Sequence, residues 1–239
     1  MMDRRPVTLK KQARELLAGR WGLPNVAALF RLVSEILTAF VISRFFPTAL
    51  RSTMPFVLAV SVGLILILFL YVIRAGLTRV ILRIARQQKA VPADIVYAFK
   101  DQPDRFLTVG VLYTVMQMLY VVPLVCYISL VGLTTLPGIV LTAVWGIGGG
   151  LYLLRFHLTY VMAVPALIDD PMLGAMNAMK KSAALMKGQR LHLLHLEFTF
   201  IGWGLIALLS TGIGLLWIVP YHEAARLLYY LDLVRERQG

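Results

Sequence analysis

A few charged and titratable side chains stand inside long apolar stretches of this sequence, and they are its first candidates for chemistry. Two pairs of opposite charge lie one helical turn apart: Arg31 with Glu35, and Glu223 with Arg226, next to His222. A charge at the centre of a membrane helix costs about 2.5–3.5 kcal/mol on insertion scales, so such residues are rare unless they serve a purpose. We expect these five residues to form a polar intramembrane site, either a cavity between the first and last membrane helices or internal ion pairs that fix helix packing.

The remaining histidines and acids offer weak grounds for metal binding or catalysis. The spacing of His192 and His195 places them on one helix face, with Glu197 nearby, but His222 is expected at a different depth. No Gly-x-Ser-x-Gly, Gly-x-Gly-x-x-Gly or Walker motif occurs. The sequence therefore predicts no catalytic residue, no metal and no cofactor, and it favours a non-enzymatic role.

The elements that must position these residues are membrane helices. Of the 239 residues, 59% are hydrophobic and 15% are charged, whereas soluble domains are roughly half apolar and a quarter charged. Residues 106–154 contain no charged residue and no histidine. As a single helix this run would be about 74 Å long, more than twice the ~30 Å hydrocarbon core of a bilayer. We expect an all-α integral membrane protein in which this run folds back on itself.

The hydrophobic pattern predicts about six transmembrane helices. Residues 1–24 are expected to form a basic cytoplasmic helix, and residues 25–239 a single polytopic membrane domain. The six spans are expected near residues 25–46, 56–75, 106–131, 137–165, 191–210 and 215–234. The turn between the third and fourth spans is expected at 132–138, closed by Pro137 and Gly138. Residues 191–234 allow one span or two, and a hairpin that turns at 211–214 is favoured because a single straight helix would measure about 66 Å.

Amphipathic cytoplasmic helices are expected near residues 8–20, 76–100 and 171–188. Asp170 and Pro171 would begin the last of them, as N-cap and first helical residue. The cations of the second and third helices are candidates for contact with the headgroups of anionic lipids. These candidates are Arg79, Arg83, Arg86, Lys180, Lys181 and Lys187.

The positive charges are distributed unevenly between the expected loops. The net charge is +12, and segments 1–24, 74–105 and 166–190 hold six, seven and four Lys or Arg residues. The loops at 47–55 and 132–138, on the opposite side of a six-span arrangement, hold one and none. By the positive-inside rule both termini are expected in the cytoplasm. No basic run is interleaved with aromatics as in a nucleic-acid-binding surface, so the expected partners are anionic lipids and a membrane protein or a second copy of the chain.

Short motifs in the C-terminal part of the chain follow one another in a distinctive order. They are Leu136-Pro137-Gly138-Ile139, Tyr160 to Pro165 leading to Asp169-Asp170-Pro171, Phe200-Ile201-Gly202-Trp203, Gly212 to Trp217, Pro220-Tyr221 and Tyr229-Tyr230. In this order they resemble the bacterial membrane family known as domain of unknown function 975, which looks related to the membrane domain attached to some glycerophosphodiester phosphodiesterases. The resemblance implies a multi-pass protein of the bacterial inner membrane with an unassigned role, and it transfers no active-site residue.

The sequence therefore leaves two functions open. The first is a non-enzymatic scaffold or accessory protein that contacts anionic lipid and a membrane partner. The alternative is a transporter or lipid-handling protein that uses the polar intramembrane residues. A cavity around those residues would favour the alternative, whereas paired and closely packed side chains would favour the scaffold.

Overall fold

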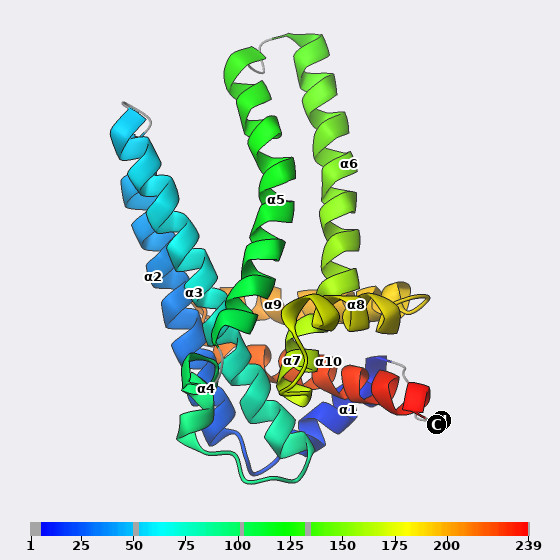
Figure 1. The fold of residues 1–239 in the computed structure, drawn as a ribbon. Helices are drawn as coiled ribbons and strands as arrows, with labels where there is room; N and C mark the ends of the chain where they lie inside the picture. Colours follow the sequence, from blue (N-terminus) through cyan, green and yellow to red (C-terminus); the bar gives the residue numbers. More distant parts are fainter. Residues whose placement is uncertain (1–5, 50–52, 101–102, 132–134, 239) are drawn as a thin grey trace.

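Two long helical hairpins rise from a base of shorter and crosswise helices (Figure 1). The computed structural model describes residues 6–49, 53–100, 103–131 and 135–238, and the regular elements within these ranges are helices. The all-helical fold predicted from the sequence is therefore confirmed for the part of the chain that the structure describes.

The hairpins supply the membrane-capable segments. The first consists of α2 (Gly22–Ala49) and α3 (Thr53–Ala85), and the second of α5 (Pro103–Val131) and α6 (Leu136–Tyr160), which α7 (Ala163–Asp169) follows. Four segments of these helices are long and apolar enough to cross a membrane: Gly22–Arg44, Ser61–Ala85, Pro103–Leu124 and Leu136–Asp169. They correspond to the first four expected spans, and they support a membrane protein.

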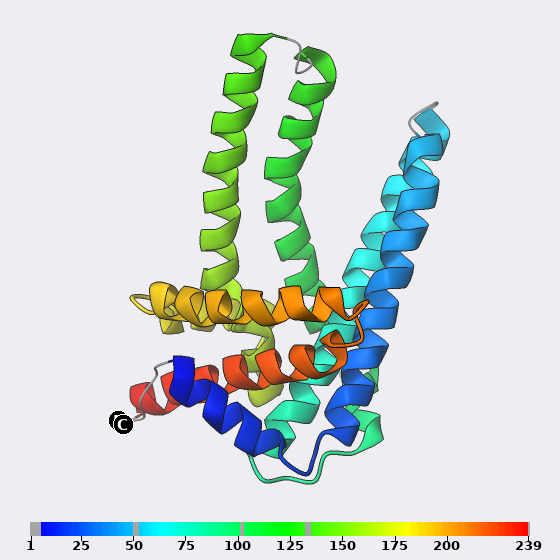
Figure 2. The ribbon, with the colours of Figure 1, turned by 180° about the vertical axis from the view of Figure 1, so that it is seen from behind.

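The base contains the other helices. These are α1 (Pro6–Leu17), the 3-10 helix η1 (Pro92–Val96), α4 (Tyr97–Lys100), α8 (Ala175–Leu185), α9 (Arg190–Leu209) and α10 (Leu215–Gln238). In both views α9 and α10 run across the feet of the hairpins (Figures 1 and 2). The expected fifth and sixth spans coincide with α9 and α10 in their bounds, but they are not confirmed, because neither helix is among the membrane-capable segments of the described residues. Both helices are interrupted by charged and histidine side chains, which make membrane insertion costly.

The base is layered, with α10 between α9 and α1. In Figure 2, α9 lies nearest the hairpins and α1 farthest from them, and α10 contacts both neighbours. The apolar stripe of α1 consists of Leu9, Ala13 and Leu17, which repeat every four residues and are fully buried. The expected amphipathic helix at the N-terminus thus turns its apolar face toward α10.

Three expected boundaries differ from the structure. The amphipathic helix expected near 76–100 is divided, because α3 continues to Ala85 and η1 begins only at Pro92. Pro137 and Gly138 lie in the first turn of α6, which Thr135 caps by accepting a hydrogen bond from the Gly138 amide at 3.3 Å; positions 132–134 of the expected turn lie outside the described residues. Asp170 follows α7 and α8 begins only at Ala175, so Asp170 and Pro171 form a connection and not a helix start.

The turn expected between α9 and α10 is present. The chain reverses there through Thr211 and Gly212, whose φ angles of 55° and 85° are both left-handed. A glycine adopts this conformation without steric cost, which explains why a Gly follows Thr211 at the reversal.

The lower end of α3 is covered by η1. Gly76 faces this 3-10 helix so closely that a Cβ atom would overlap the backbone carbonyl of Ile95. Asp94 of η1 accepts a hydrogen bond from the Val91 amide at 2.8 Å and lies 3.2 Å from Arg83 of α3. The absence of a side chain at Gly76 therefore allows the two elements to meet.

We predict that Gly76→Ala destabilises the protein, because the backbone of η1 must move away from α3. Overpacking of this kind costs about 1–3 kcal/mol, which should lower the thermal unfolding temperature in detergent by several degrees. Gly63→Ala is the matched control on the same helix, since a Cβ there meets nothing within 4 Å. Equal unfolding temperatures for the two variants would contradict the close packing at Gly76.

Candidate functional site

Polar side chains converge where α10 crosses the first hairpin. α10 contacts both α2 and α3, and the residues predicted as an intramembrane polar site lie on α2 and α10 at this crossing. The structure therefore brings together Arg31, Glu35, His222, Glu223 and Arg226. We refer to this region as the crossing site.

Glu223 links α10 to α3 within the crossing site. Its side chain is 5% exposed, and the hydroxyl of Thr78 donates a hydrogen bond to Oε1 at 2.7 Å. Arg226 donates a hydrogen bond to Oε2 from the next turn of α10. Burial by itself raises the pKa of the Glu223 carboxyl, but the charges of Arg226 and Arg31 and the Thr78 hydrogen bond outweigh it and lower the pKa to about 2. The carboxylate is therefore ionised and paired on both oxygens.

Glu35 links α2 to α3 in the same way. Its Oε1 accepts hydrogen bonds from Arg31 Nε at 3.0 Å and from Arg74 at 3.1 Å. Arg31 is one turn away on α2, whereas Arg74 belongs to the neighbouring α3. Arginines from two helices thus share the Glu35 carboxylate.

Glu197 and His222 form a third pair, which joins α9 to α10. The Nε2 atom of His222 lies 2.6 Å from Oε2 of Glu197, and the ring of Phe200 meets the imidazole at a centroid distance of 4.9 Å. Oε1 of Glu197 is buried and has no hydrogen-bond partner among the described residues. His157 of α6 interacts electrostatically with Glu197 and Arg226.

The charged side chains of the crossing site pair with one another and thereby hold neighbouring helices together. Each of its three glutamates, Glu35, Glu197 and Glu223, has a cationic or histidine partner on its own or an adjacent helix. Breaking one buried charge pair leaves an uncompensated charge and is strongly destabilising. Within the described ranges, no group of three His, Cys, Asp or Glu side chains is placed to hold a metal ion.

The six cations predicted to contact lipid fall into two sets. Arg79 and Arg83 lie 3.9 Å and 3.2 Å from the carboxylate of Asp94, and Arg86 pairs with Asp169 of α7. The guanidinium of Arg79 also lies over the ring of Tyr97 at 4.3 Å. These three arginines therefore hold η1, α4 and α7 against α3, a use that the sequence did not indicate.

The lysines of the second set lie on and just after α8. Lys180 and Lys187 are exposed, and Lys181 is half-buried. The opposite side of α8 packs on α5, α6 and α7, and the Ser182 hydroxyl donates a hydrogen bond to the carbonyl of Thr159 at 2.8 Å. Figure 1 places α8 at the foot of α6, level with α9. Met176 of the same helix is 55% exposed, so α8 presents both cationic and apolar side chains there.

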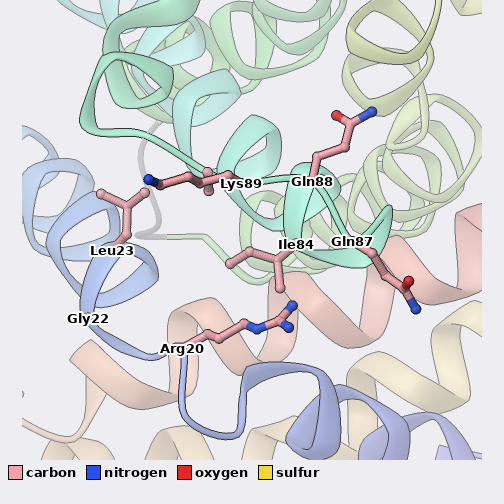
Figure 3. A pocket seen from close by; sticks show the side chains of 8 residues that line it. Arg20, Gly22, Leu23, Ile84, Gln87, Gln88 and Lys89 are labelled. Atoms are coloured by element: carbon pink, nitrogen blue, oxygen red, sulfur yellow. The ribbon is translucent and has the colours of Figure 1, made fainter.

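A pocket of about 470 Å³ lies at the lower end of the first hairpin (Figure 3). Its lining comprises Arg20, Gly22, Leu23, Ile84, Gln87, Gln88, Lys89 and Ala90. Most of these side chains are exposed, and none belongs to the predicted site residues.

Sequence reasoning did not identify several partners of the predicted charged residues. Arg74 directly follows the apolar run 56–73 and could have been noticed as a charge at its end, but Thr78 carries no signal of its own. Tyr230 is fully buried and its hydroxyl donates a hydrogen bond to Asp169 at 3.2 Å. Tyr230 and Asp169 both lie in the motifs that carry the family resemblance, so the sequence did single out these two positions.

Comparison with known proteins gives a family without a described activity. A family model described as "Protein of unknown function (DUF975)" matches residues 1–237. No curated protein matches the chain, and neither does any solved structure. The relation to the membrane domain of glycerophosphodiester phosphodiesterases is not among these findings and stays a prediction.

We predict that Glu223→Gln lowers the free energy of unfolding by about 3–5 kcal/mol at pH 7, because Arg226 loses its buried counter-charge. A carboxyl whose folded pKa is depressed contributes stability above its unfolded pKa of about 4.3, and this contribution is lost as the pH falls toward 2. The difference in unfolding temperature between wild type and variant should therefore shrink from pH 6 to pH 3. Glu15→Gln, at an exposed position of α1, is the control, and an equal loss in both variants would contradict the role of Glu223.

Proposed function

The chain belongs to the DUF975 family of proteins of unknown function, and from that premise we propose that it is a non-enzymatic scaffold of the bacterial cytoplasmic membrane. In this proposal the hairpins anchor the protein in the bilayer with both termini in the cytoplasm. The base then forms a platform at the cytoplasmic surface that contacts anionic lipid and a membrane partner, which is another protein or a second copy of the chain.

The observation that carries this proposal is the pairing of charges at the crossing site. Glu223 is engaged by Thr78 and Arg226, and Glu35 by Arg31 and Arg74. Each pair joins neighbouring helices or turns, and the carboxylates are already engaged within the protein. Paired and packed charges are the arrangement expected of a structural joint between α2, α3 and α10.

The distribution of cations supports the orientation. The basic segments of α1, lower α3 and α8 gather at the end of the molecule opposite the hairpin loops (Figure 1). Cytoplasmic segments of membrane proteins carry an excess of Lys and Arg, which favours placing this end inside the cell. Lys180, Lys181 and Lys187 then lie where α8 meets the anionic surface of the inner leaflet.

The hairpins offer surfaces for a membrane partner. Large apolar side chains of α2 point outward, among them Val33, Leu37 and Phe40, which are 53–60% exposed. Apolar patches of this kind contact lipid or another membrane helix. We place the partner protein or second copy on these surfaces.

The alternative, a transporter or lipid-handling protein, rests on one observation. Glu197 has a buried oxygen without a hydrogen-bond partner among the described residues, beside His222 and near His157. Titratable groups from three helices could relay a proton or hold a polar headgroup. Reconstituted liposomes that carry a fluorescent lipid or a pH gradient separate the two functions: transfer or flux that Glu197→Gln abolishes would establish the alternative, and rates equal to those of protein-free liposomes would support the scaffold.

We predict that replacing Lys180, Lys181 and Lys187 with alanine weakens the retention of anionic lipid. A lysine near an anionic surface contributes about 1 kcal/mol, so the triple variant in nanodiscs of phosphatidylglycerol and phosphatidylcholine should retain at least tenfold less phosphatidylglycerol. The difference should diminish as salt is raised, because exposed charges are screened. Native mass spectrometry of the extracted complexes measures it.

The matched control replaces Arg79, Arg83 and Arg86 with alanine. Because these arginines pair with Asp94 and Asp169, this variant should lose thermal stability more than it loses lipid. Unchanged retention of phosphatidylglycerol in the lysine variant would overturn the lipid contact proposed for α8.

A further inference from the structure

α9 carries apolar side chains on opposite sides. The buried side that faces the base includes Leu193, Leu196 and Phe200. The outer side presents Leu191, Phe198, Leu205 and Leu209, which are 58–86% exposed. Spacings of seven, seven and four residues keep these four side chains on one helix face. The first two turns also expose His192 and His195, whereas residues 198–209 carry no charge and no histidine on either side. A helical stretch that is apolar on every side is stable only inside a protein core or a membrane, so the outer side of residues 198–209 requires an apolar environment beyond this chain.

The position of α9 indicates what supplies that environment. The helix crosses the feet of α5 and α6, on the hairpin side of α10, whereas α1 lies on the far side (Figures 1 and 2). The four membrane-capable segments belong to the hairpins. α9 is therefore the layer of the base closest to the bilayer, and its outer side continues the apolar surface of the spans.

The distribution of polar residues along α9 and α10 argues against two further spans. Arg190, His192, His195 and Glu197 occupy the first eight residues of α9, which leaves residues 198–209, about 18 Å of helix, without a charge or a histidine. In α10 only residues 215–221, about 10 Å, precede His222 and Glu223. Each stretch is shorter than the ~30 Å hydrocarbon core, and inserting either helix fully would carry its charges into it.

Two tryptophans lie close to the turn that joins the helices. Trp203 of α9 and Trp217 of α10 are 50% and 49% exposed. Tryptophan is enriched where acyl chains meet headgroups, because its ring is apolar and its N–H is polar. Their exposure fits a turn that stays at the interface.

We propose that α9 is an in-plane membrane helix, with its outer side immersed in the acyl chains of the cytoplasmic leaflet and the α9–α10 turn on the cytoplasmic side. The ligand of this surface is the bilayer itself. Interfacial helices bury their apolar face about 5–10 Å into the boundary between headgroups and acyl chains. Glu197 can remain ionised in this arrangement because it points inward to His222.

Single cysteines in a Cys126→Ser background test the sidedness of the turn. Lys187→Cys marks the side of the base, and Leu136→Cys, 76% exposed at the start of α6, marks the side of the hairpin loops. A membrane-impermeant maleimide is applied to spheroplasts and to inside-out vesicles. Thr211→Cys should react only from the side at which Lys187→Cys reacts; labelling from the side of Leu136→Cys would overturn the proposal and establish two spans.

Spin labels at Phe198 and Leu205 test what covers the outer side of α9. In liposomes both labels should be relaxed at least fivefold more by oxygen, which partitions into lipid, than by a water-soluble nickel complex. A label at the exposed position Glu15 of α1 should show the opposite preference. Labels at Phe198 and Leu205 that prefer the nickel complex, or that are shielded from both reagents by a second copy of the chain, would overturn the proposal.

Discussion

A buried carboxylate determines how the base is assembled. Glu223 lies where α10 crosses α3, and an ionised group in such a place is tolerated only when both of its oxygens are paired. Thr78 supplies one partner from α3 and Arg226 the other from α10. Because these partners sit on crossing helices, satisfying the charge fixes where along the hairpin α10 docks. α1 and α9 then pack on either side of α10. Tyr229 and Tyr230 attach α10 to Gln189, directly before α9, and to Asp169 at the end of α7.

In the proposed orientation, the layers around α10 run from lipid to water. On the side near the hairpins, residues 198–209 of α9 carry apolar side chains on both faces, whereas α1, on the far side, buries only Leu9, Ala13 and Leu17. The charged residues between these layers pair with one another, as at Glu197 and His222. In the proposed orientation α9 lies between these polar interactions and the bilayer, and the base forms a platform supported by the membrane.

Local features of the fold were predictable from the sequence, and the orientation of its last two helices was not. Hydrophobic runs indicated the four membrane-capable segments, and glycines indicated the turn at Thr211 and Gly212. The fifth and sixth spans were expected because residues 191–234 are mostly apolar, yet the decisive information lies in pairings between distant residues, such as Thr78 with Glu223. The same holds for three arginines that looked like free cations. Their partners lie elsewhere in the sequence: Asp94 pairs with Arg79 and Arg83, and Asp169 pairs with Arg86. A single sequence indicates that a charge needs a partner but does not identify it.

α10 runs across the feet of the hairpins in both views of the fold (Figures 1 and 2). Spin labels at the two ends of this helix, Trp217 and Arg235, report in liposomes whether it lies flat in the membrane plane. The immersion depths of the two labels should differ by less than about 10 Å, with both labels near the headgroups or outside them. Because α10 would rise about 27 Å between these positions if it stood upright, a difference close to that length would contradict this orientation.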